Sequence, residues 1–415
     1  MNQAVASQET EAEVSDGKII CHIDNVRVHS VQAHIKTAHE NTWTLERYQS
    51  EFPDMPILSD FAKDLLARKA QEKAVALKAS AAAAAGVTAN TSGGEKMMQS
   101  TILTSLAQFH EVFELGTAPA AMSGAGNPIS IEVMSGHDLE SLDYVPDIDS
   151  GYVYEIDLLK KVIIGFALNM PTYLWGMHGT GKTSVLQQAA ARTKRPFIRV
   201  QHTINMQESE VLGQWTVRDG ATQFQMGPLP QAMIMGWVYC ADEYDMAMPS
   251  VVAVYQPVLE GQALLVKDAP PHLRKIIPHP NFRFVATGNT NGIGDETGLY
   301  QGTLVQNAAN YSRFKITEEV KYMNEKMEEN ILCLKLAIDR KDAKKIIKFG
   351  VTVRQMFADQ KISMVVSTRE LLSAVELGVA YGGNWPLGLE LAFANRLSRV
   401  DRAVVKEYMQ RVFTV

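Results

Sequence analysis

The feature that most constrains this chain is a glycine-rich loop between an apolar run and a segment with a helical pattern. The apolar run ends at Trp175, the loop begins at Gly176, and the helical pattern runs from Ser184 to Arg192. The letters GMHGTGKTS from 176 to 184 fit the spacing G-x-x-x-x-G-K-[ST] of a phosphate-binding P-loop. A glycine-rich turn with a chance Lys-Thr is the alternative, but the flanking strand and helix favour nucleotide binding.

Each residue type in this loop has a physical reason to be there. Glycines let backbone N–H groups curl around a phosphate, and the next helix directs its positive N-terminus at the same group. Lys182 would place a charge on the β- and γ-phosphates of ATP, and the Thr183 hydroxyl would bind Mg²⁺. The candidate nucleotide-binding residues are Gly176, His178, Gly179, Thr180, Gly181, Lys182, Thr183 and Ser184.

A second apolar run, 237–241, ends in the carboxylates Asp242 and Glu243. In a buried parallel strand both would lie at the carboxyl edge of the sheet, beside the P-loop. Asp242 would then hold Mg²⁺ with Thr183, and Glu243 would orient the attacking water. An acidic turn after a strand is the alternative, and the P-loop upstream argues against it.

Two further positions are candidates on weaker local grounds. The segment 282–288 is predicted to be another strand, and it ends in the polar Asn289. In the ring ATPases that this order of motifs resembles, such a strand lies between the two described above, so Asn289 could touch the γ-phosphate or the attacking water. A lone strand-end Asn is otherwise a turn former. Arg369 lies at the start of a predicted helix, 367–381, from which it could reach phosphate; the alternative is an ordinary surface arginine.

The bulk composition sets the class of protein. The chain has 415 residues, 46% of them hydrophobic and 21% charged, which predicts a globular protein of two or three domains. Its net charge of −6 gives no basic field for nucleic acid. We predict a cytoplasmic protein without a membrane partner, for three reasons. The three cysteines are widely spaced, no apolar run is long enough to span a membrane, and the sequence shows no signal-peptide pattern.

The start of the chain carries a finger-like pattern. Cys21 and Asp24, followed by His34 and His39, match the spacing of a C₂H₂ zinc finger, except that Asp24 stands where the second cysteine belongs. Such a site would hold Zn²⁺ less tightly than one with two thiolates. The alternative is a metal-free module with a small apolar core.

The rest of the chain gives an outline of its organisation. We expect a disordered tail at 1–18, the finger-like module at 19–58, a helix, linker and small N-terminal region at 59–143, an ATPase core at 144–318 and a helical lid at 319–415. Within these, 102–115 has apolar residues at helical spacing and is predicted to be a short amphipathic helix. Hairpins are predicted around Asp219-Gly220 and at 263–277.

The order of these motifs resembles the AAA+ ATPases of the MoxR and chelatase clade, and is most similar to the CobS type, the small ATPase subunit of aerobic cobaltochelatase. The stretches that carry the resemblance are YVPDID at 144–149, GMHGTGK at 176–182, DEYD at 242–245, NTNGIG at 289–294, GLYQG at 298–302 and SRF at 312–314. The resemblance implies an α/β AAA+ core, a parallel sheet between helices, followed by a helical lid.

The resemblance also implies roles for single residues. Asn289 corresponds to sensor 1, Arg313 to the arginine finger that reaches a neighbouring subunit's ATP, and Arg369 to sensor 2. Ser312 stands where the family usually has Asp before the finger arginine, which puts the support of the finger in doubt.

We therefore expect an enzyme that hydrolyses ATP to ADP and phosphate with Mg²⁺, assembles as a homo-oligomeric ring, which the resemblance implies to be a hexamer, and remodels a partner protein. The resemblance implies a von Willebrand A-type partner in a chelatase-like complex, although nothing in the chain recognisably binds a tetrapyrrole. The alternatives are a nucleic-acid-associated AAA+ motor and a non-hydrolysing, ATP-gated scaffold.

Overall fold

The computed structural model describes residues 18–60 apart from 29, 40, 41 and 54, then 63, and 103–413 apart from 219. These residues belong to two compact units, one of Met1–Leu103 with Met134–Ile148, the other of Thr104–Val133 with Asp149–Val415. The expected tail, linker and most of the helix after 59 lie outside the described residues. The domain boundaries taken from the sequence therefore stay predictions.

The first unit begins with a small finger-like module. A two-stranded antiparallel hairpin is followed by two short helices, and five buried side chains form their core. The elements are β1 (Ile19–Ile20), β2 (Arg27–Val28), α1 (Val31–Ala38) and α2 (Leu45–Glu51). The same unit contains α5 (Leu139–Asp143), which Asp138 caps by accepting a hydrogen bond from the Ser141 amide at 2.7 Å.

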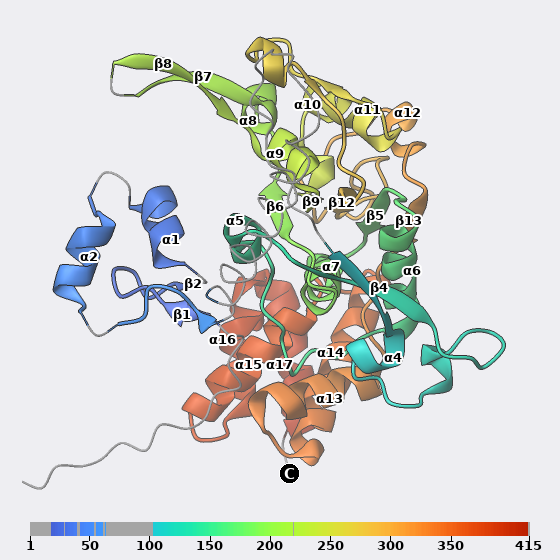
Figure 1. Ribbon diagram of the computed structural model, residues 1–415. Coiled ribbons are helices and arrows are strands. Elements are labelled where there is room, and N and C mark those ends of the chain that lie inside the picture. Colours follow the sequence, from blue (N-terminus) through green and yellow to red (C-terminus); the bar gives the residue numbers. More distant parts are fainter. Residues whose placement is uncertain are drawn as a thin grey trace, which may run out of the picture. The chain divides into compact units, whose positions relative to one another are not determined.

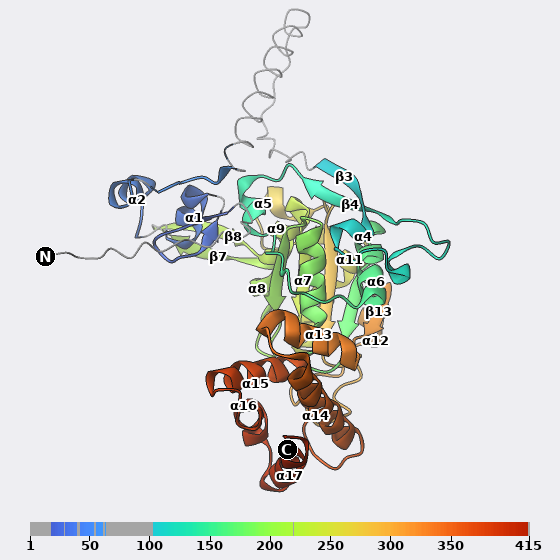
Figure 2. The same ribbon diagram turned by 90° about the horizontal axis from the view of Figure 1, so that it is seen from below.

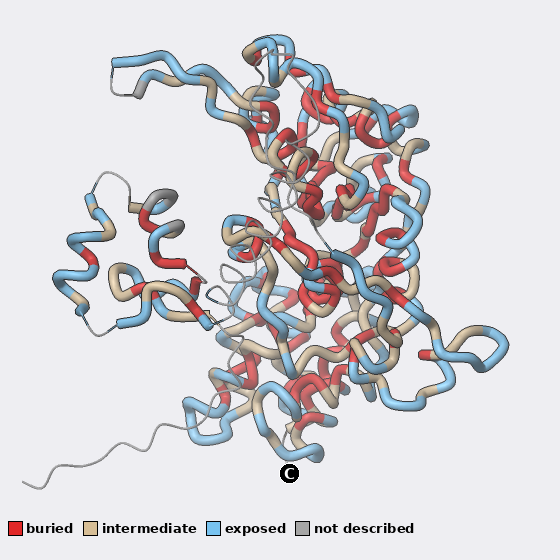
Figure 3. The backbone as a smooth tube through the Cα atoms, viewed as in Figure 1, coloured by how far each residue is buried: buried red, intermediate tan, exposed pale blue. Residues whose placement is uncertain are grey.

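The second unit is organised around a five-stranded parallel sheet in the order β13-β5-β12-β9-β6. The strands are β5 (Thr172–Trp175), β6 (Phe197–Gln201), β9 (Val238–Asp242), β12 (Arg283–Gly288) and β13 (Ile316–Glu319). As expected from the sequence, β12 lies between β5 and β9. Every residue of β9 and β12 is buried (Figure 3), which explains why apolar side chains predominate in both strands.

Alternate residues of these strands face opposite sides of the sheet. On one side Leu174, Cys240 and Val285 pack against α6 (Ile156–Ala167) and α7 (Lys182–Arg192), which Figure 2 shows in front of the strands. On the other side Tyr173 and Phe284 join a cluster of aromatic rings. Its other members are Tyr239, Tyr244, Tyr255, Tyr311 and Phe314.

Shorter elements connect the strands. The two predicted hairpins are present as the antiparallel pairs β7–β8 and β10–β11, and the first projects from the unit (Figure 1). The elements are η1 (Pro119–Ala121), α8 (Glu208–Leu212), β7 (Gly213–Arg218), β8 (Ala221–Met226), α9 (Pro228–Met235), η2 (Tyr244–Met246), α10 (Pro249–Val252), η3 (Ala253–Tyr255), α11 (Gln256–Leu259), β10 (Leu264–Leu265), η4 (Pro271–Leu273), β11 (Lys275–Ile276) and α12 (Ala308–Tyr311).

A helical lid completes the second unit. Its helices share one apolar core, to which each contributes buried side chains. They are α13 (Glu325–Leu336), α14 (Arg340–Ala358), α15 (Thr368–Ala380), α16 (Trp385–Ala392), the 3₁₀ turn η5 (Ala394–Arg396) and α17 (Arg399–Phe413). The predicted fold class, a parallel sheet between helices with a helical lid, is confirmed. No helix in the described part of the chain is long and apolar enough to cross a membrane.

One predicted element is wrong. The segment 102–115 is not a single helix, because Leu103–Gln108 forms strand β3, which pairs with β4 (Ser130–Ser135), and only Phe109–Val112 is helical, as α4. Leu106 is 74% exposed, whereas Phe109 is buried. The apolar positions thus face different ways, and the pairing strand decides the backbone conformation.

Candidate nucleotide-binding and hydrolysis site

The glycine-rich loop joins β5 to α7 in a conformation that depends on its glycines. Gly176 has a φ of 139° and Gly181, which caps α7, has a φ of 91°. Only glycine enters this region freely. A Cβ on Gly176 would lie 2.4 Å from the carbonyl oxygen of Val320, just beyond β13. The loop therefore places glycine backbone at the N-terminus of a helix, where phosphate groups bind.

The ammonium group of Lys182 is folded into this loop. Its Nζ donates to the carbonyl oxygens of Gly176 at 2.7 Å and Met177 at 2.9 Å, and to Asn289 Oδ1 at 3.3 Å. Burial lowers the pKa of Lys182 to about 8, although neighbouring carboxylates oppose the shift. All three partners are neutral oxygens, and a phosphate is a stronger partner for an ammonium group.

Asp242 lies at the end of β9 and connects three strands. Its Oδ1 accepts from the Thr183 hydroxyl at 2.7 Å and from the Thr287 hydroxyl, and its Oδ2 accepts from Arg199 Nε at 2.6 Å. The carboxylate is only 2% exposed. A hydroxyl and a carboxylate at this separation supply the hard oxygen ligands that Mg²⁺ prefers.

Glu243 follows with its backbone in the left-handed region, at a φ of 55°. Its Oε2 accepts from Asn289 Nδ2 at 2.5 Å. Burial, together with the charges of Asp245 and Asp242, raises the pKa of Glu243. A carboxylate with a raised pKa is a better proton acceptor at neutral pH. Asn289 therefore links Glu243 to Lys182 across the strand ends.

Asp245 is the residue that our reading of the sequence left without a role. It is fully buried, and its Oδ2 accepts from the Asn289 amide at 2.9 Å and from the Thr290 amide and hydroxyl, each at 2.8 Å. Burial raises its pKa. Asp245 thus fixes the backbone that carries the Asn289 side chain. In the sequence it was visible as the last residue of the DEYD stretch at 242–245, which carried the family resemblance but gave this carboxylate no role. Arg199, on β6, gave no signal at all.

Two tyrosines hold the middle of the loop from outside. The His178 amide donates to the Tyr300 hydroxyl at 2.9 Å, and the His178 carbonyl accepts from the Tyr322 hydroxyl at 2.9 Å. Within the loop, the Thr180 hydroxyl donates to the Met177 carbonyl at 2.9 Å. Because Tyr300 precedes β13 and Tyr322 follows it, the P-loop is held by the chain on both sides of that strand. The remaining candidate, Ser184, is exposed in the first turn of α7.

The lid meets the P-loop at the start of α15. Ser367 and Glu370 form a capping box there, and a Cβ on Gly179 would lie 2.5 Å from the Ser367 Cβ. Arg369 is exposed, and its charge adds to burial and to Lys182 in lowering the pKa of His178. The structure thus brings Arg369 to the P-loop.

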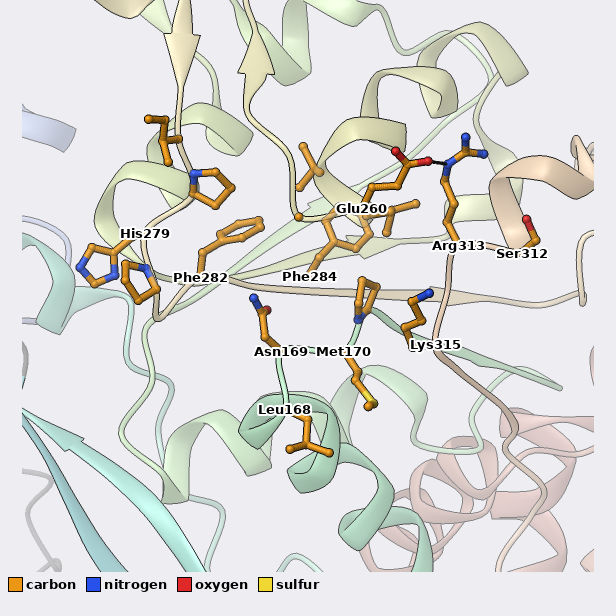
Figure 4. A pocket seen from close by; sticks show the side chains of 17 residues that line it. Leu168, Asn169, Met170, Glu260, His279, Phe282, Phe284, Ser312, Arg313 and Lys315 are labelled. Atoms are coloured by element: carbon orange, nitrogen blue, oxygen red, sulfur yellow. Dashed lines mark hydrogen bonds and ion pairs between the residues drawn. The ribbon is translucent and has the colours of Figure 1, made fainter.

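Arg313 lies elsewhere. Its Nε donates to Glu260 Oε1 at 2.6 Å (Figure 4). Its guanidinium also donates to the Ala309 carbonyl at 2.5 Å. It lines a cavity of about 650 Å³ together with Ser312 and Lys315. No hydrogen bond or ion pair among the described residues joins Arg313 to the P-loop, Asp242, Glu243 or Asn289.

The four finger-like residues also come together. One ligand atom from each of Cys21, Asp24, His34 and His39 lies within 4.8 Å of the others. Asp24 Oδ2 is 2.7 Å from His34 Nε2 and 3.0 Å from His39 Nε2. The spacing in the sequence therefore predicted a real cluster.

Comparison with known proteins identifies the family. Residues 171–314 match the model of the AAA domain of the dynein-related subfamily. The chain is 33% identical over 283 residues to the aerobic cobaltochelatase subunit CobS of a Sinorhizobium species, covering 66% of this chain and 84% of that protein. This chain belongs to the CobS family of AAA+ ATPases. It is also 32% identical over 179 residues to midasin of Dictyostelium discoideum, of which it covers 3%.

Solved structures resemble this CobS-family chain more distantly. A putative ATPase from Cytophaga hutchinsonii has 16% identity and a TM-score of 0.34, covering 66% of this chain and 92% of that one. The Holliday junction branch migration motor RuvB of Thermotoga maritima has 12% identity and a TM-score of 0.37, covering 66% and 74% respectively.

The residues of this AAA+ site fit the nucleotide that an AAA domain binds. Glycine at position 176 lets the loop pack against the backbone of Val320, and the loop leads into the N-terminus of α7, where a phosphate can bind. The hydroxyl of Thr183 and the carboxylate of Asp242 form an oxygen pair suited to Mg²⁺. Lys182, Thr183, Asp242, Glu243 and Asn289, which the sequence predicted as site residues, lie together in the structure, and their roles stay predictions. Asp245, Arg199 and the two tyrosines also contact this group.

Proposed function

We propose that this AAA+ ATPase hydrolyses ATP as one subunit of a hexameric ring and uses the energy to remodel a partner protein. The observation that carries the proposal is the distribution of the candidate residues. Lys182, Thr183, Asp242, Glu243 and Asn289 meet at one edge of the sheet, whereas Arg313 makes none of these contacts. A complete active site then needs an arginine from a neighbouring subunit.

Each residue has a distinct part in this proposal. Bound Mg²⁺ would neutralise charge on the phosphates. Thr183 and Asp242 hold it, and Lys182 exchanges its carbonyl partners for phosphate oxygens. Glu243 orients the attacking water and accepts its proton, and its raised pKa suits that task. Asn289 keeps the carboxylate of Glu243 in position.

The remaining arginines complete the arrangement. Arg369 reaches the nucleotide from the lid, as a sensor of its presence. Arg313 serves the next subunit's γ-phosphate, and a finger of this kind contributes about 10³–10⁵ in rate. It must first leave Glu260, with which it is paired in the free subunit.

The proposed partner is a protein of the von Willebrand A type. Similarity to a cobaltochelatase subunit supports a chelatase-like complex. The projecting β7–β8 hairpin offers an exposed contact surface, since Trp215 is 49% and Val217 73% exposed.

A trapping experiment tests the proposal. Glu243→Gln should bind ATP without hydrolysing it, so the ring stays closed on its partner and retains it in a pull-down. Lys182→Ala is the matched control, because it should lose ATP and with it the partner. Equal recovery of the partner by both variants would refute ATP-driven remodelling. DNA-stimulated hydrolysis would instead support the nucleic-acid motor, and undiminished turnover by Glu243→Gln would remove Glu243 from the mechanism.

A further inference from the structure

The finger-like module has too little core for its length. Among the residues of the module that the structure describes, the buried apolar side chains are Cys21, Val28, Val31, Ile35 and Tyr48. Domains of about 40 residues or fewer usually need a disulfide, a metal or a partner to stay folded. All three cysteines of the chain are unpaired. A disulfide therefore does not stabilise this module.

A tight turn brings the first two members of the cluster together. The Cys21 amide donates to the Val26 carbonyl at 2.8 Å, and the Asn25 amide donates back to the Cys21 carbonyl at 2.8 Å. Asn25 has a φ of 61°, which lets the chain reverse. As a result the thiol and the Asp24 carboxylate lie on the same side of the β1–β2 turn.

The second pair comes from the helix that follows. His34 lies on α1 and His39 directly after it, and both direct Nε2 at Asp24 Oδ2. The two rings are nearly perpendicular, at 80° with centroids 5.2 Å apart. A carboxylate with two imidazoles can be a simple hydrogen-bonded group. That group would not need a buried thiol, but the Cys21 Sγ atom lies within 4.8 Å of the other three ligand atoms.

We propose that Cys21, Asp24, His34 and His39 form a structural Zn²⁺ site that holds the N-terminal module together. The ligand set of one thiolate, two imidazoles and one carboxylate suits Zn²⁺ in tetrahedral geometry. Zinc bonds of about 2.0–2.3 Å give ligand-to-ligand separations of about 3.3–3.8 Å. To bind the ion, separations near the upper bound of 4.8 Å would shorten by about 1 Å, whereas Asp24 Oδ2 would move about 0.3–0.6 Å away from the two Nε2 atoms, which now lie at 2.7 and 3.0 Å. This site lies outside the ATPase site and goes beyond the proposed function.

The single thiolate has a consequence for affinity. A carboxylate in place of a second thiolate makes the site weaker and more readily exchanged than a Cys₂His₂ site. The variant Asp24→Cys would restore the second thiolate at the correct spacing. It should therefore bind Zn²⁺ at least about tenfold more tightly, which separates a metal site from a hydrogen-bonded cluster.

The experiment uses the full-length protein purified without chelators. Elemental analysis should find about one zinc per chain, and Co²⁺ substitution should give tetrahedral d–d bands with a thiolate charge-transfer band. Cys21→Ser should lose the metal and the charge-transfer band. Cys333→Ser is the matched control, since this cysteine lies in α13 of the lid and should leave both unchanged.

Two results would overturn the proposal. One is a wild-type protein that takes up neither Zn²⁺ nor Co²⁺ while residues 19–58 remain protected from proteolysis. The other is an Asp24→Cys variant that competes with a chromogenic chelator no better than the wild type. Because Asp24→Cys adds a ligand instead of deleting one, this second test stays informative even if Cys21→Ser unfolds the module.

Discussion

Replacing Asp245 with asparagine should slow ATP hydrolysis far more than it weakens ATP binding. Asp245 touches neither Lys182 nor Glu243 through a hydrogen bond; it acts through the backbone of Asn289 and Thr290. Asn289 in turn contacts both Glu243 and Lys182. A small displacement of this asparagine therefore reaches the residue proposed to orient the water.

The magnitude follows from three hydrogen bonds at one oxygen. Hydrogen bonds to a charged acceptor contribute about 1.5–3 kcal/mol each and neutral ones about 1 kcal/mol, so Asp245→Asn forfeits about 3 kcal/mol in total. Removing a buried charge offsets part of that loss, which leaves about 1–2 kcal/mol of destabilisation. A misplacement well under 1 Å at Asn289 should cost about 10–100-fold in kcat. KM for ATP should change by less than about twofold, because the phosphate contacts are untouched.

Steady-state ATPase kinetics and thermal unfolding of the same preparations test this prediction. Asp401→Asn is the control, because Asp401 also accepts two hydrogen bonds at one oxygen, from the Ser363 amide at 3.1 Å and hydroxyl at 2.5 Å, but within the lid. It should lower Tm without changing kcat. If Asp245→Asn likewise lowers only Tm, Asp245 is a packing residue and its link to Asn289 has no catalytic meaning.

Three further predictions address the loop and the subunit boundary. Burial lowers the pKa of Lys182 to about 8 in the nucleotide-free subunit, and contact with phosphate should raise it toward the ordinary lysine value of 10.5. ATP binding should therefore take up protons between about pH 8 and pH 10.5. Calorimetry in buffers of different ionisation enthalpy should show that this proton uptake fades below about pH 7 and is absent in Lys182→Arg. Arg313→Ala should bind ATP normally but hydrolyse it at least about 10³-fold more slowly, and mixing it with Glu243→Gln should restore some activity in rings shown to be mixed by native mass spectrometry; no recovery would count against a shared site. Gly179→Ala should weaken ATP binding at least about tenfold in a fluorescent-nucleotide titration, because its Cβ would collide with Ser367. Gly116→Ala is the control, because Gly116 has a similar φ but no atom near the added Cβ, and it should leave the affinity unchanged. Equal affinities of the two variants would show that the lid moves aside at no cost to ATP binding.

The parts of the site that follow local patterns were predictable. Two patterns can be recognised within about a dozen residues each: a strand that ends in a glycine-rich loop, and a buried strand that ends in Asp242-Glu243. The position of β12 between them followed from family resemblance and brought Asn289 into place.

The parts that depend on distant partners were not predictable. Asp245 acts on Asn289 only because η2 and the end of β12 lie side by side, and Arg199 reaches Asp242 from the neighbouring strand β6. The local pattern predicts helix where strand β3 forms, because the partner that makes it a strand, β4, is more than twenty residues away in the chain. In each case the contact that decides the structure is tertiary, and the spacing of apolar residues along the sequence does not reveal it.

The order of the sheet also bears on how the protein is made. Strand β5, which carries the P-loop, pairs only with β12 and β13, and both leave the ribosome roughly a hundred residues or more after it. Translation proceeds at about 5–20 residues per second, so the backbone hydrogen-bonding groups of this apolar strand stay unpaired for at least several seconds. During that interval its edges can pair with another nascent chain, so the segment that carries the P-loop is exposed to aggregation while the protein is being made.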